Sequence, residues 1–379
     1  MNSLQIGNLS IPIPLIQGGM GVGISLSGLA AAVANEGGVG VISCAGLGLL
    51  YKEYSTNLWE ASIHGLREEL RKAREKTSGV IGVNIMVALS DFAEMVKTAI
   101  SEKADIIFSG AGLPLDLPSF LKKDSTTKLV PIVSSARAAK IICEKWKKNY
   151  DYLPDAIVVE GPKAGGHLGF KPEQINDDNY KLEKLIPEVV AEVKQFEEKY
   201  NQPIPVIAAG GIYTGKDIYD IMQLGASGVQ MGTRFVTTEE CDASPAFKQA
   251  YIDAASEDIE IIKSPVGMPG RAITSNFLKK VKNGETQPQH CPFKCIKTCE
   301  IESSPYCIVG ALINALRGNF EKGYAFAGSN AFKATHITSV KELFKTLIDE
   351  FKASMRNVSS EYLKKNIHKP EIYSSQIGV

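Results

Sequence analysis

The sequence predicts a (β/α)₈ TIM barrel with a C-terminal, mostly helical extension. Eight short runs rich in β-branched residues alternate with helical stretches over about the first 230 residues, the order and length typical of this barrel. Several runs are apolar without alternation, as expected of strands covered on both faces. Ordinary globular composition, with 44% hydrophobic and 22% charged residues, argues against a disordered or fibrous chain.

The expected strands are placed by their apolar runs. They are residues 13–17, 39–43, 80–86, 105–109, 129–134, 156–160, 205–209 and 228–232. The helical patterns between them are residues 27–35, 91–102, 136–147, 182–199 and 215–224. The segment 47–78 is longer than an ordinary connection and contains a charged helical stretch, so we expect it to cover part of the barrel mouth.

A doubly wound open sheet is the rival fold, because glycines follow the first expected strand. The dinucleotide-binding fingerprint of such sheets is G-x-G-x-x-G. Starting from Gly19 and Gly21, the closing position is Ile24, and starting from Gly21 and Gly23 it is Leu26. The fingerprint fails in both registers, which favours the barrel.

The chain divides into an expected barrel over residues 1–240 and an extension over residues 241–379 that packs on it. The extension contains a helical pattern near 245–255, a cysteine cluster at 291–307 and a charged helical pattern near 340–355. This region is too long to be a single closing helix.

Glycines at the ends of the last two strands indicate a phosphate site. Gly210 and Gly211 follow the seventh strand, and Gly232 and Thr233 follow the eighth. Residues without side chains let backbone N–H groups approach an anion, and these two loops form the usual phosphate site of TIM barrels. The alternative is that the glycines only form tight turns. A P-loop is disfavoured, since Asp217 stands where its Mg²⁺-binding hydroxyl would be.

A third glycine cluster follows the first strand, at Gly18 and Gly19 beside Met20. Bare backbone at this point would let a flat ring lie against the barrel mouth. Asn84, at the end of the third strand, can both donate and accept hydrogen bonds, which suits a heteroaromatic edge.

His167 is the candidate catalytic residue. Of the five histidines, it alone is framed by glycines after an expected strand, and an imidazole there can take a proton near neutral pH. The alternative is a loop histidine bonded to a carbonyl group. Glu160, at the end of the same strand, could be a second acid or could orient the glycine loop.

These motifs together resemble a known family. The segments PLIQGGMGVGISLSGLAAAVANEGGVGVIS, GVNIM, EGPKAGGHLGF, PVIAAGGIYTGKDIYDIMQLGASGVQMGTRF and AFAGSNA look like the nitronate monooxygenases, formerly called 2-nitropropane dioxygenases. The resemblance spans about residues 10–335. Flavin-dependent enoyl-acyl-carrier-protein reductases share much of the pattern.

The resemblance implies FMN bound non-covalently at the barrel mouth, with His167 as the catalytic base and no metal at the active site. The residues implied in FMN binding are Gly18, Gly19, Met20, Asn84, Gly165, Gly210, Gly211, Gln230, Met231, Gly232 and Thr233. Two positions depart from the pattern. Glu188 lies near a position where some members have a flavin-contacting Gln, and Lys163 stands where members often carry an acidic residue.

The implied reaction is oxidation of alkyl nitronates or nitroalkanes with O₂ to carbonyl compounds and nitrite. The alternative enzyme is an FMN-dependent enoyl-acyl-carrier-protein reductase that uses NAD(P)H. A second alternative is an FMN-binding redox or partner module without turnover. The expected partners are therefore a small-molecule substrate and O₂.

The four cysteines of the cluster are the least explained feature. Cys291, Cys295, Cys299 and Cys307 could hold a structural Zn or Fe–S cluster, remote from the flavin. Alternatively, they are reduced thiols that pack as small hydrophobic side chains.

Composition bounds the partners and the compartment. The 42 basic and 42 acidic residues cancel, so the chain has no overall field to recruit nucleic acid or an anionic membrane. No apolar run approaches the roughly 20 residues that span a bilayer. The odd count of seven cysteines does not form a disulfide framework, which favours the cytoplasm. A homodimer is compatible with the composition of the extension.

Overall fold

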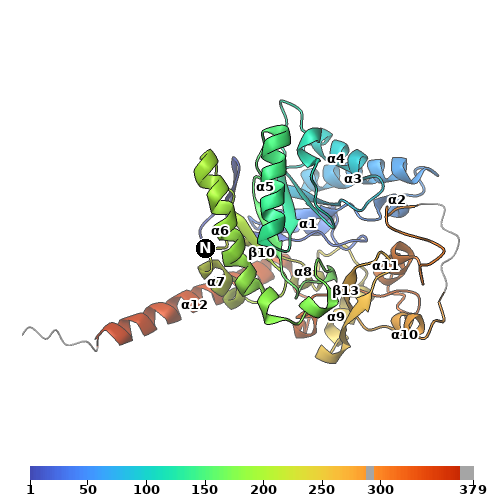
Figure 1. Cartoon of the computed structure of the whole chain (residues 1–379). Coiled ribbons are helices and arrows are strands. Elements are labelled where there is room, and N and C mark those ends of the chain that lie inside the picture. Colours follow the sequence, from blue (N-terminus) through green and yellow to red (C-terminus); the bar gives the residue numbers. More distant parts are fainter. Residues whose placement is uncertain (287–293, 368–379) are drawn as a thin grey trace, which may run out of the picture.

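The structure is a computed structural model that describes residues 1–286 and 294–367, with side chains described up to residue 357. Eight parallel strands close into a barrel (Figure 1), which confirms the predicted fold. In the order in which they pair, the strands are β3 (Leu15–Gln17), β4 (Val39–Ser43), β5 (Val80–Met86), β6 (Ile106–Gly110), β7 (Lys128–Val133), β8 (Ile157–Glu160), β10 (Val206–Ala209) and β11 (Gly228–Met231). Every end lies within two residues of its expected position.

Helices surround the barrel. They are α1 (Ser27–Asn35), α2 (Leu47–Leu50), α3 (Leu58–Lys76), α4 (Phe92–Ser101), α5 (Ala136–Tyr150), α6 (Leu182–Tyr200), α7 (Gly215–Gln223) and α12 (Val340–Ile367). The last of these, α12, packs against α7 and α1, so it occupies the position of the eighth barrel helix. Gly215 marks how closely it packs, because a Cβ there would lie 2.1 Å from the carbonyl oxygen of Leu347.

The position of α12 divides the C-terminal part of the chain. A short helix, α8 (Thr233–Val236), follows the last strand, and α12 closes the ring about a hundred residues later. Residues 237–339 are therefore an insertion between the eighth strand and its closing helix. The boundary drawn at residue 240 stays a prediction.

The insertion carries its own small sheet and helices. Its elements are α9 (Pro245–Asp253), β12 (Ile259–Lys263), β13 (Pro269–Ile273), α10 (Asn276–Lys282) and α11 (Ile308–Leu316). The strands β12 and β13 pair with β9 (Gly166–His167), which belongs to the loop after β8. Short 3₁₀ helices complete the chain at Leu117–Phe120, Pro172–Gln174, Asp178–Tyr180, Ser256–Asp258 and Ala331–Lys333.

A hairpin that the apolar pattern did not predict closes the amino-terminal end of the barrel. It consists of β1 (Leu4–Ile6) and β2 (Leu9–Ile11). Leu4, Ile6 and Ile11 are buried in the same apolar cluster as barrel side chains such as Val41 and Phe108. Strands of three residues are too short to show an alternation, and only their packing under the barrel defines them.

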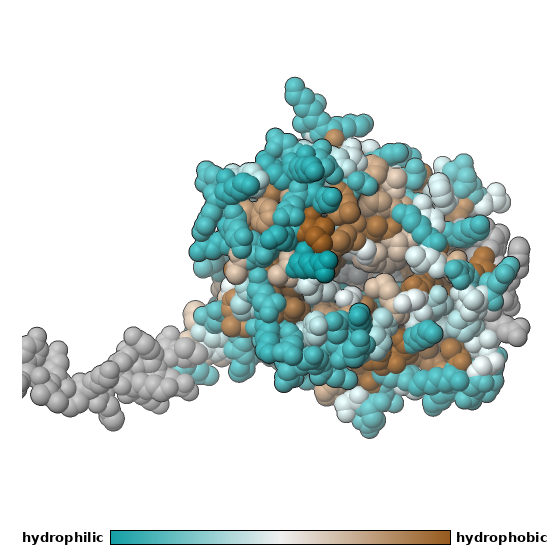
Figure 2. All heavy atoms as spheres, viewed as in Figure 1, coloured by the Kyte–Doolittle hydropathy of each residue, from teal (hydrophilic) through white to brown (hydrophobic). Residues whose placement is uncertain are grey.

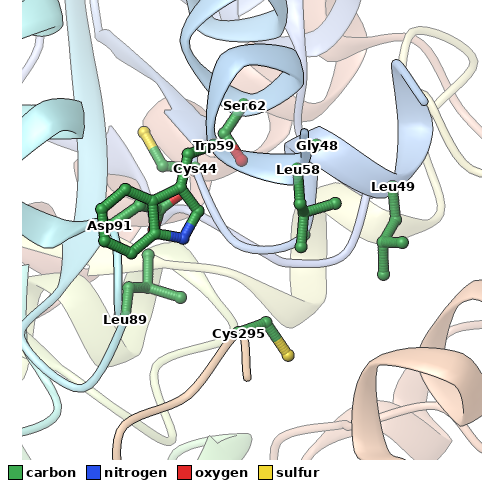
Figure 3. A pocket seen from close by; sticks show the side chains of 10 residues that line it. Cys44, Gly48, Leu49, Leu58, Trp59, Ser62, Leu89, Asp91 and Cys295 are labelled. Atoms are coloured by element: carbon green, nitrogen blue, oxygen red, sulfur yellow. The ribbon is translucent and has the colours of Figure 1, made fainter. Parts of the chain in front are cut away.

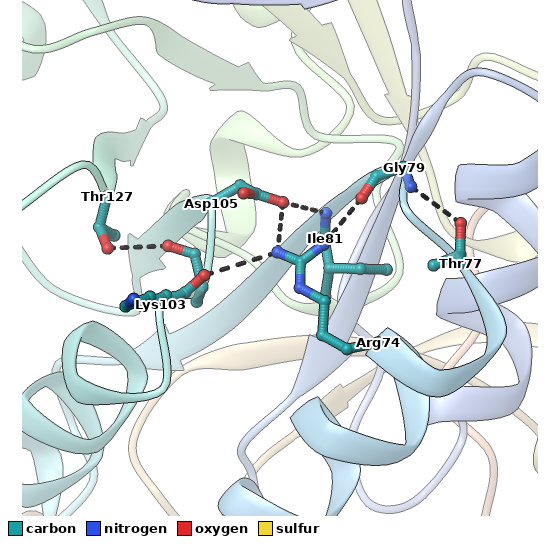
Figure 4. A network of polar contacts seen from close by, with 8 residues as sticks. Arg74, Thr77, Gly79, Ile81, Lys103, Asp105 and Thr127 are labelled. Atoms are coloured by element: carbon teal, nitrogen blue, oxygen red, sulfur yellow. Dashed lines mark hydrogen bonds and ion pairs between the residues drawn. The ribbon is translucent and has the colours of Figure 1, made fainter.

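A polar network fixes the starts of β5 and β6 (Figure 4). One carboxylate oxygen of Asp105, Oδ2, accepts hydrogen bonds from Nη2 of Arg74 at 2.6 Å and from the backbone N–H of Ile81 at 2.7 Å. Arg74 also donates from Nη1 to the carbonyl oxygen of Gly79 at 2.8 Å. The end of α3 is thus tied to two neighbouring strands, on the side of the barrel opposite the strand ends that carry the glycine motifs.

The cysteine cluster lies only partly in the described chain. Cys291 falls outside the described residues, and Cys295, Cys299 and Cys307 lie in turns that precede α11. These three thiols are partly exposed and pack against an apolar cluster of the insertion. Across residues 1–286 and 294–367, no group of three or more His, Cys, Asp or Glu side chains is placed to hold a metal ion.

Within the helices of the described chain, no segment is both long enough and apolar enough to cross a membrane.

Candidate functional site

A large cavity opens at the carboxyl ends of the barrel strands, where the insertion covers them. Its volume is about 610 Å³, within the range of small-molecule and cofactor sites. In Figure 2 the surface is hollowed near the middle of the drawn face, with both apolar and polar residues around the hollow.

The residues singled out from the sequence come together in this cavity. Its lining includes Gly18, Gly19, Met20, Asn84, Gly165, His167, Gly210, Gly211, Gln230, Met231, Gly232 and Thr233. They come from the ends of five of the eight strands, which meet because the strands are parallel and the barrel is closed. Their individual roles toward a ligand stay predictions.

The floor of the cavity requires glycine at the end of β3. A Cβ on Gly19 would lie 2.3 Å from Cβ of Asn84, and one on Gly18 would lie 3.2 Å from Cγ of Gln230. Gln17 holds this turn, because its amide donates to the carbonyl of Gly18 and accepts from the N–H of Val41. Gln17 was not predicted as a site residue, although it is fully buried and directly precedes the glycines.

The backbone after β10 is left-handed where it lines the cavity, and an arginine follows the lining residues of β11 in the chain. Gly210 and Gly211 have φ angles of +94° and +85°, which side chains rarely adopt. Nearby, Arg234 contacts the hydroxyl of Tyr213 through Nη1 at 3.3 Å. The Nε atom of Arg234 is buried and has no hydrogen-bond partner in the described chain. Such an orphaned donor indicates a place for a polar ligand or water.

The late AFAGSNA segment returns to this same end. The N–H of Gly328 donates to the hydroxyl of Thr233 at 2.9 Å, and the amide of Asn330 donates to the carbonyl of Gly211 at 2.6 Å. The hydroxyl oxygen of Ser329 is buried without a partner among the residues described. Neither Ser329 nor Asn330 was predicted individually, since nothing in their spacing along the chain relates them to Gly211 or Thr233.

His167 lies on the cavity wall in β9. Its Nε2 atom is 2.8 Å from the hydroxyl oxygen of Ser264, and its ring packs edge-on against Phe326 with centroids 5.0 Å apart. Burial lowers the pKa of His167 to about 4. The imidazole is therefore neutral around pH 7, and it has no carboxylate partner in the described part of the chain.

The loop before His167 is held by a buried arginine. Arg271 of β13 donates from Nη1 to the carbonyl oxygens of Pro162 and Ala164, at 2.7 and 2.6 Å. Burial lowers the pKa of Arg271 to about 10, so the guanidinium remains charged at neutral pH. The guanidinium of Arg271 thus binds backbone carbonyls of this loop.

Glu160 ends β8 and also lines the cavity. Burial raises the pKa of its carboxyl group to about 7. Within the described residues it makes no hydrogen bond or ion pair with another side chain. It is therefore a carboxyl group that changes charge near neutral pH beside the ligand space.

Part of the cavity lining is apolar. It includes Leu113, in the loop after β6, and Ile296, Val309 and Leu312 of the insertion. These side chains provide apolar surface for part of a ligand, beyond the glycine-rich floor.

A small neighbouring pocket is not a second site (Figure 3). Cys44, Trp59, Asp91 and Cys295 line it, and its volume is about 20 Å³, room for one water molecule. Burial raises the pKa of the Cys44 thiol far above its ordinary value, so this thiol is not activated as a nucleophile.

One protein family matches most of the chain. The family model described as nitronate monooxygenase matches residues 2–350. The chain belongs to the nitronate monooxygenase family. Members of this family are oxidoreductases, and the match includes both the barrel and the insertion.

Two named relatives resemble the chain at moderate identity. A 5-hydroxy-7a-methyl-1-oxo-octahydro-1H-indene-4-carboxyl-CoA dehydrogenase of Rhodococcus jostii is 27% identical over 270 residues, which cover 71% of this chain and 65% of the relative. The matched region is thus less than two thirds of that relative's length. A probable nitronate monooxygenase of Staphylococcus aureus is 29% identical over 314 residues, covering 73% of this chain and 79% of the relative.

Solved structures share the architecture. FabK from Thermotoga maritima superposes with a TM-score of 0.71 at 28% identity, covering 93% of this chain and 96% of FabK. A nitroalkane oxidase from Streptomyces ansochromogenes has a TM-score of 0.69 at 21% identity, covering 92% of this chain and 98% of that one. The second likeness concerns the fold alone.

Proposed function

We propose that the protein is an FMN-dependent oxidoreductase that oxidises alkyl nitronates, or the nitroalkanes from which they form, with O₂ to carbonyl compounds and nitrite. The observation that carries the proposal is His167, a neutral imidazole on the wall of a large cavity in a nitronate monooxygenase family member. A neutral imidazole can take the α-proton of a nitroalkane, whose anion is the nitronate.

The residues of the cavity fit FMN. The bare floor at Gly18 and Gly19 leaves a surface against which a flat ring could lie, and a side chain at Gly19 would collide with Asn84. The left-handed glycines after β10 and the first turn of α8 would offer backbone N–H groups to the phosphate of FMN. Arg234, whose Nε atom has no hydrogen-bond partner in the described chain, is the second residue of α8. When bound, FMN would supply the electron-accepting chemistry.

The protein's own groups then have separate tasks. Gly210, Gly211, Gly232 and Thr233 would hold the phosphate, and the remaining lining residues named in the sequence motifs would contact the ring. His167 would act as the base toward a neutral nitroalkane. Lys163, an exposed cation on the rim of the same cavity, would favour an anionic substrate.

The test is a purification followed by two assays. We expect a yellow protein that releases FMN on denaturation and that consumes O₂ when it is mixed with a preformed alkyl nitronate. A protein that cannot be reconstituted with FMN would refute the cofactor assignment. FMN-loaded protein without O₂ uptake on any nitronate would refute the reaction.

A second candidate is an FMN-dependent enoyl-thioester reductase that uses NAD(P)H. The apolar part of the cavity lining supports it, because a nitroalkane of a few carbons does not need that surface. So do the likeness to FabK and the CoA thioester named for the Rhodococcus relative. Anaerobic mixing with NADH distinguishes the two: rapid bleaching of the flavin favours the reductase. FMN without either reaction would indicate a binding module.

A further inference from the structure

The only side chain bonded to His167 in the described chain is a hydroxyl, that of Ser264. Ser264 follows β12 and is 2% exposed. Its backbone N–H donates to the carbonyl of Met268 at 3.1 Å, and its carbonyl accepts from Gly267 at 3.1 Å. These bonds fix the turn between β12 and β13 independently of the side chain. The hydroxyl is therefore held against Nε2 of the imidazole, at 2.8 Å.

The hydrogen bonds of this hydroxyl indicate which ring nitrogen carries the proton. A serine hydroxyl has one proton to donate and two lone pairs to accept. One lone pair of Ser264 faces the N–H of Val266 at 3.4 Å. Among the residues described, Nε2 of His167 is the only acceptor in reach of the hydroxyl proton. If Nε2 carried a proton, that buried hydroxyl would be left without an acceptor, which is unfavourable.

The neutral ring therefore has its proton on Nδ1. Burial lowers the pKa of His167 to about 4, so the neutral form predominates at pH 7. No described residue hydrogen-bonds to Nδ1, while the side chain as a whole lines the cavity. The edge contact with Phe326 limits rotation of the ring. An Nδ1–H group is thus available to a ligand as a donor.

We propose that Ser264 is a positioning residue that fixes the resting tautomer of His167, with Nε2 accepting from Ser264 and Nδ1–H available to the substrate. The preferred substrate form is then the anionic nitronate, whose oxygen accepts from Nδ1–H. A neutral nitroalkane must give up a proton, yet one nitrogen is occupied by Ser264 and the other is already protonated. The nitroalkane can therefore lose its proton to His167 only after the imidazole has changed tautomer. This second part depends on the proposed function, and the tautomer itself does not.

Nitrogen NMR of the full-length, FMN-loaded protein tests the tautomer directly. With ¹⁵N-labelled histidine and His167→Gln for assignment, we expect the wild-type ring at pH 7 to be neutral with its proton on Nδ1. Ser264→Ala should give a mixture of tautomers, and Ser264→Thr, which keeps the hydroxyl, should restore the wild-type signal. A proton on Nε2 in the wild type, or a His167 signal unchanged by Ser264→Ala, would overturn the inference.

Kinetics test the consequence for the substrate. We expect kcat/KM for a preformed nitronate to exceed that for the matching nitroalkane by about tenfold or more, the order set by one unsatisfied buried donor. Ser264→Ala should lower this ratio about tenfold and Ser264→Thr should not. Ser256→Ala, at an exposed serine eight residues earlier, is the matched control. An unchanged ratio in Ser264→Ala would refute the substrate preference.

The two measurements separate the claims. If the wild type oxidises neither form, the proposed function fails while the NMR result still decides the role of Ser264. Thermal unfolding of each variant verifies that the turn has folded.

Discussion

The Nη1 atom of Arg271 lies 2.6 Å from the carbonyl oxygen of Ala164, three residues before His167. The same nitrogen binds the carbonyl of Pro162. Because β13 also pairs with β9, one strand of the insertion fixes both the loop and the histidine. The insertion is therefore part of the site, although it lies outside the eight βα units.

Replacing Arg271 should loosen that loop. Arg271→Met removes a charged donor from two buried carbonyls, so we expect the free energy of unfolding to fall by about 3 kcal/mol and kcat to fall with it. Arg271→Lys, which keeps one charged donor, should lose less on both measures. Urea unfolding and steady-state assays provide the two values. A stable Arg271→Met protein with unchanged kcat would contradict the positioning role.

The sequence determined the barrel well because its strands are local signals. Each strand is a short apolar run, and most of the runs are flanked by glycine. Their short length and β-branched residues distinguish them from buried helices. The same runs end in the residues that line the cavity, since parallel strands bring their carboxyl ends to one side. This is why Asn84 and Gly210, far apart in the chain, were both placed at the mouth.

The contacts that complete the site could not be predicted in this way. Ser264, Arg271 and Asn330 come from the insertion, and each acts through a backbone carbonyl or a ring nitrogen of a distant loop. Such contacts leave no periodicity in the sequence. Likewise, the charged helical pattern near residue 340 indicated a helix, but only packing shows that α12 closes the barrel.

Gly19 should not tolerate a side chain. In Gly19→Ala, the new Cβ would lie 2.3 Å from Cβ of Asn84, so the strand end or Asn84 must move. We expect a loss of about 1–3 kcal/mol in the free energy of unfolding and weaker FMN retention on gel filtration. Gly310 lies in the helix α11, and a Cβ there would lie 3.5 Å from Sγ of Cys307. Gly310→Ala should therefore leave the free energy of unfolding unchanged or raise it slightly. Equal behaviour of the two variants would show that the floor adapts.

Glu160 should make stability depend on pH near neutrality. In the folded protein the pKa of its carboxyl group is raised from 4.5 to about 7. Its stabilising contribution to the free energy of unfolding is therefore fully present below pH 4.5 and is lost as the pH rises through 7. Glu160→Gln should therefore raise the free energy of unfolding at pH 8 by about 1–3 kcal/mol relative to wild type, and by much less at pH 4.5. Urea unfolding at both pH values measures this, with the exposed Glu173→Gln as control. The same difference at both pH values would exclude titration of Glu160 as its cause.

Asp105 should contribute to stability without affecting chemistry. Its Oδ2 atom accepts from both Arg74 and Ile81, so Asp105→Ala removes the carboxylate partner of the Arg74 guanidinium and the acceptor of the Ile81 N–H group. We expect the free energy of unfolding to fall by about 2 kcal/mol, while kcat/KM at 25 °C stays unchanged. Asp124→Ala, at an exposed loop position, should change neither. A selective loss of activity in Asp105→Ala would place this network in a different role.

His167→Ala separates the two uses of the imidazole. Loss of a general base reduces rates by about 10²–10⁴-fold, and we expect a fall of that size on neutral nitroalkanes. On preformed nitronates only a hydrogen-bond donor is lost, so the fall should be about tenfold. Bound FMN, measured by its absorbance, should remain, because the glycine-rich residues that would hold it are unchanged. His336→Ala, at an exposed histidine, serves as control. Equal losses on both substrates would remove the base role and leave His167 as a donor alone.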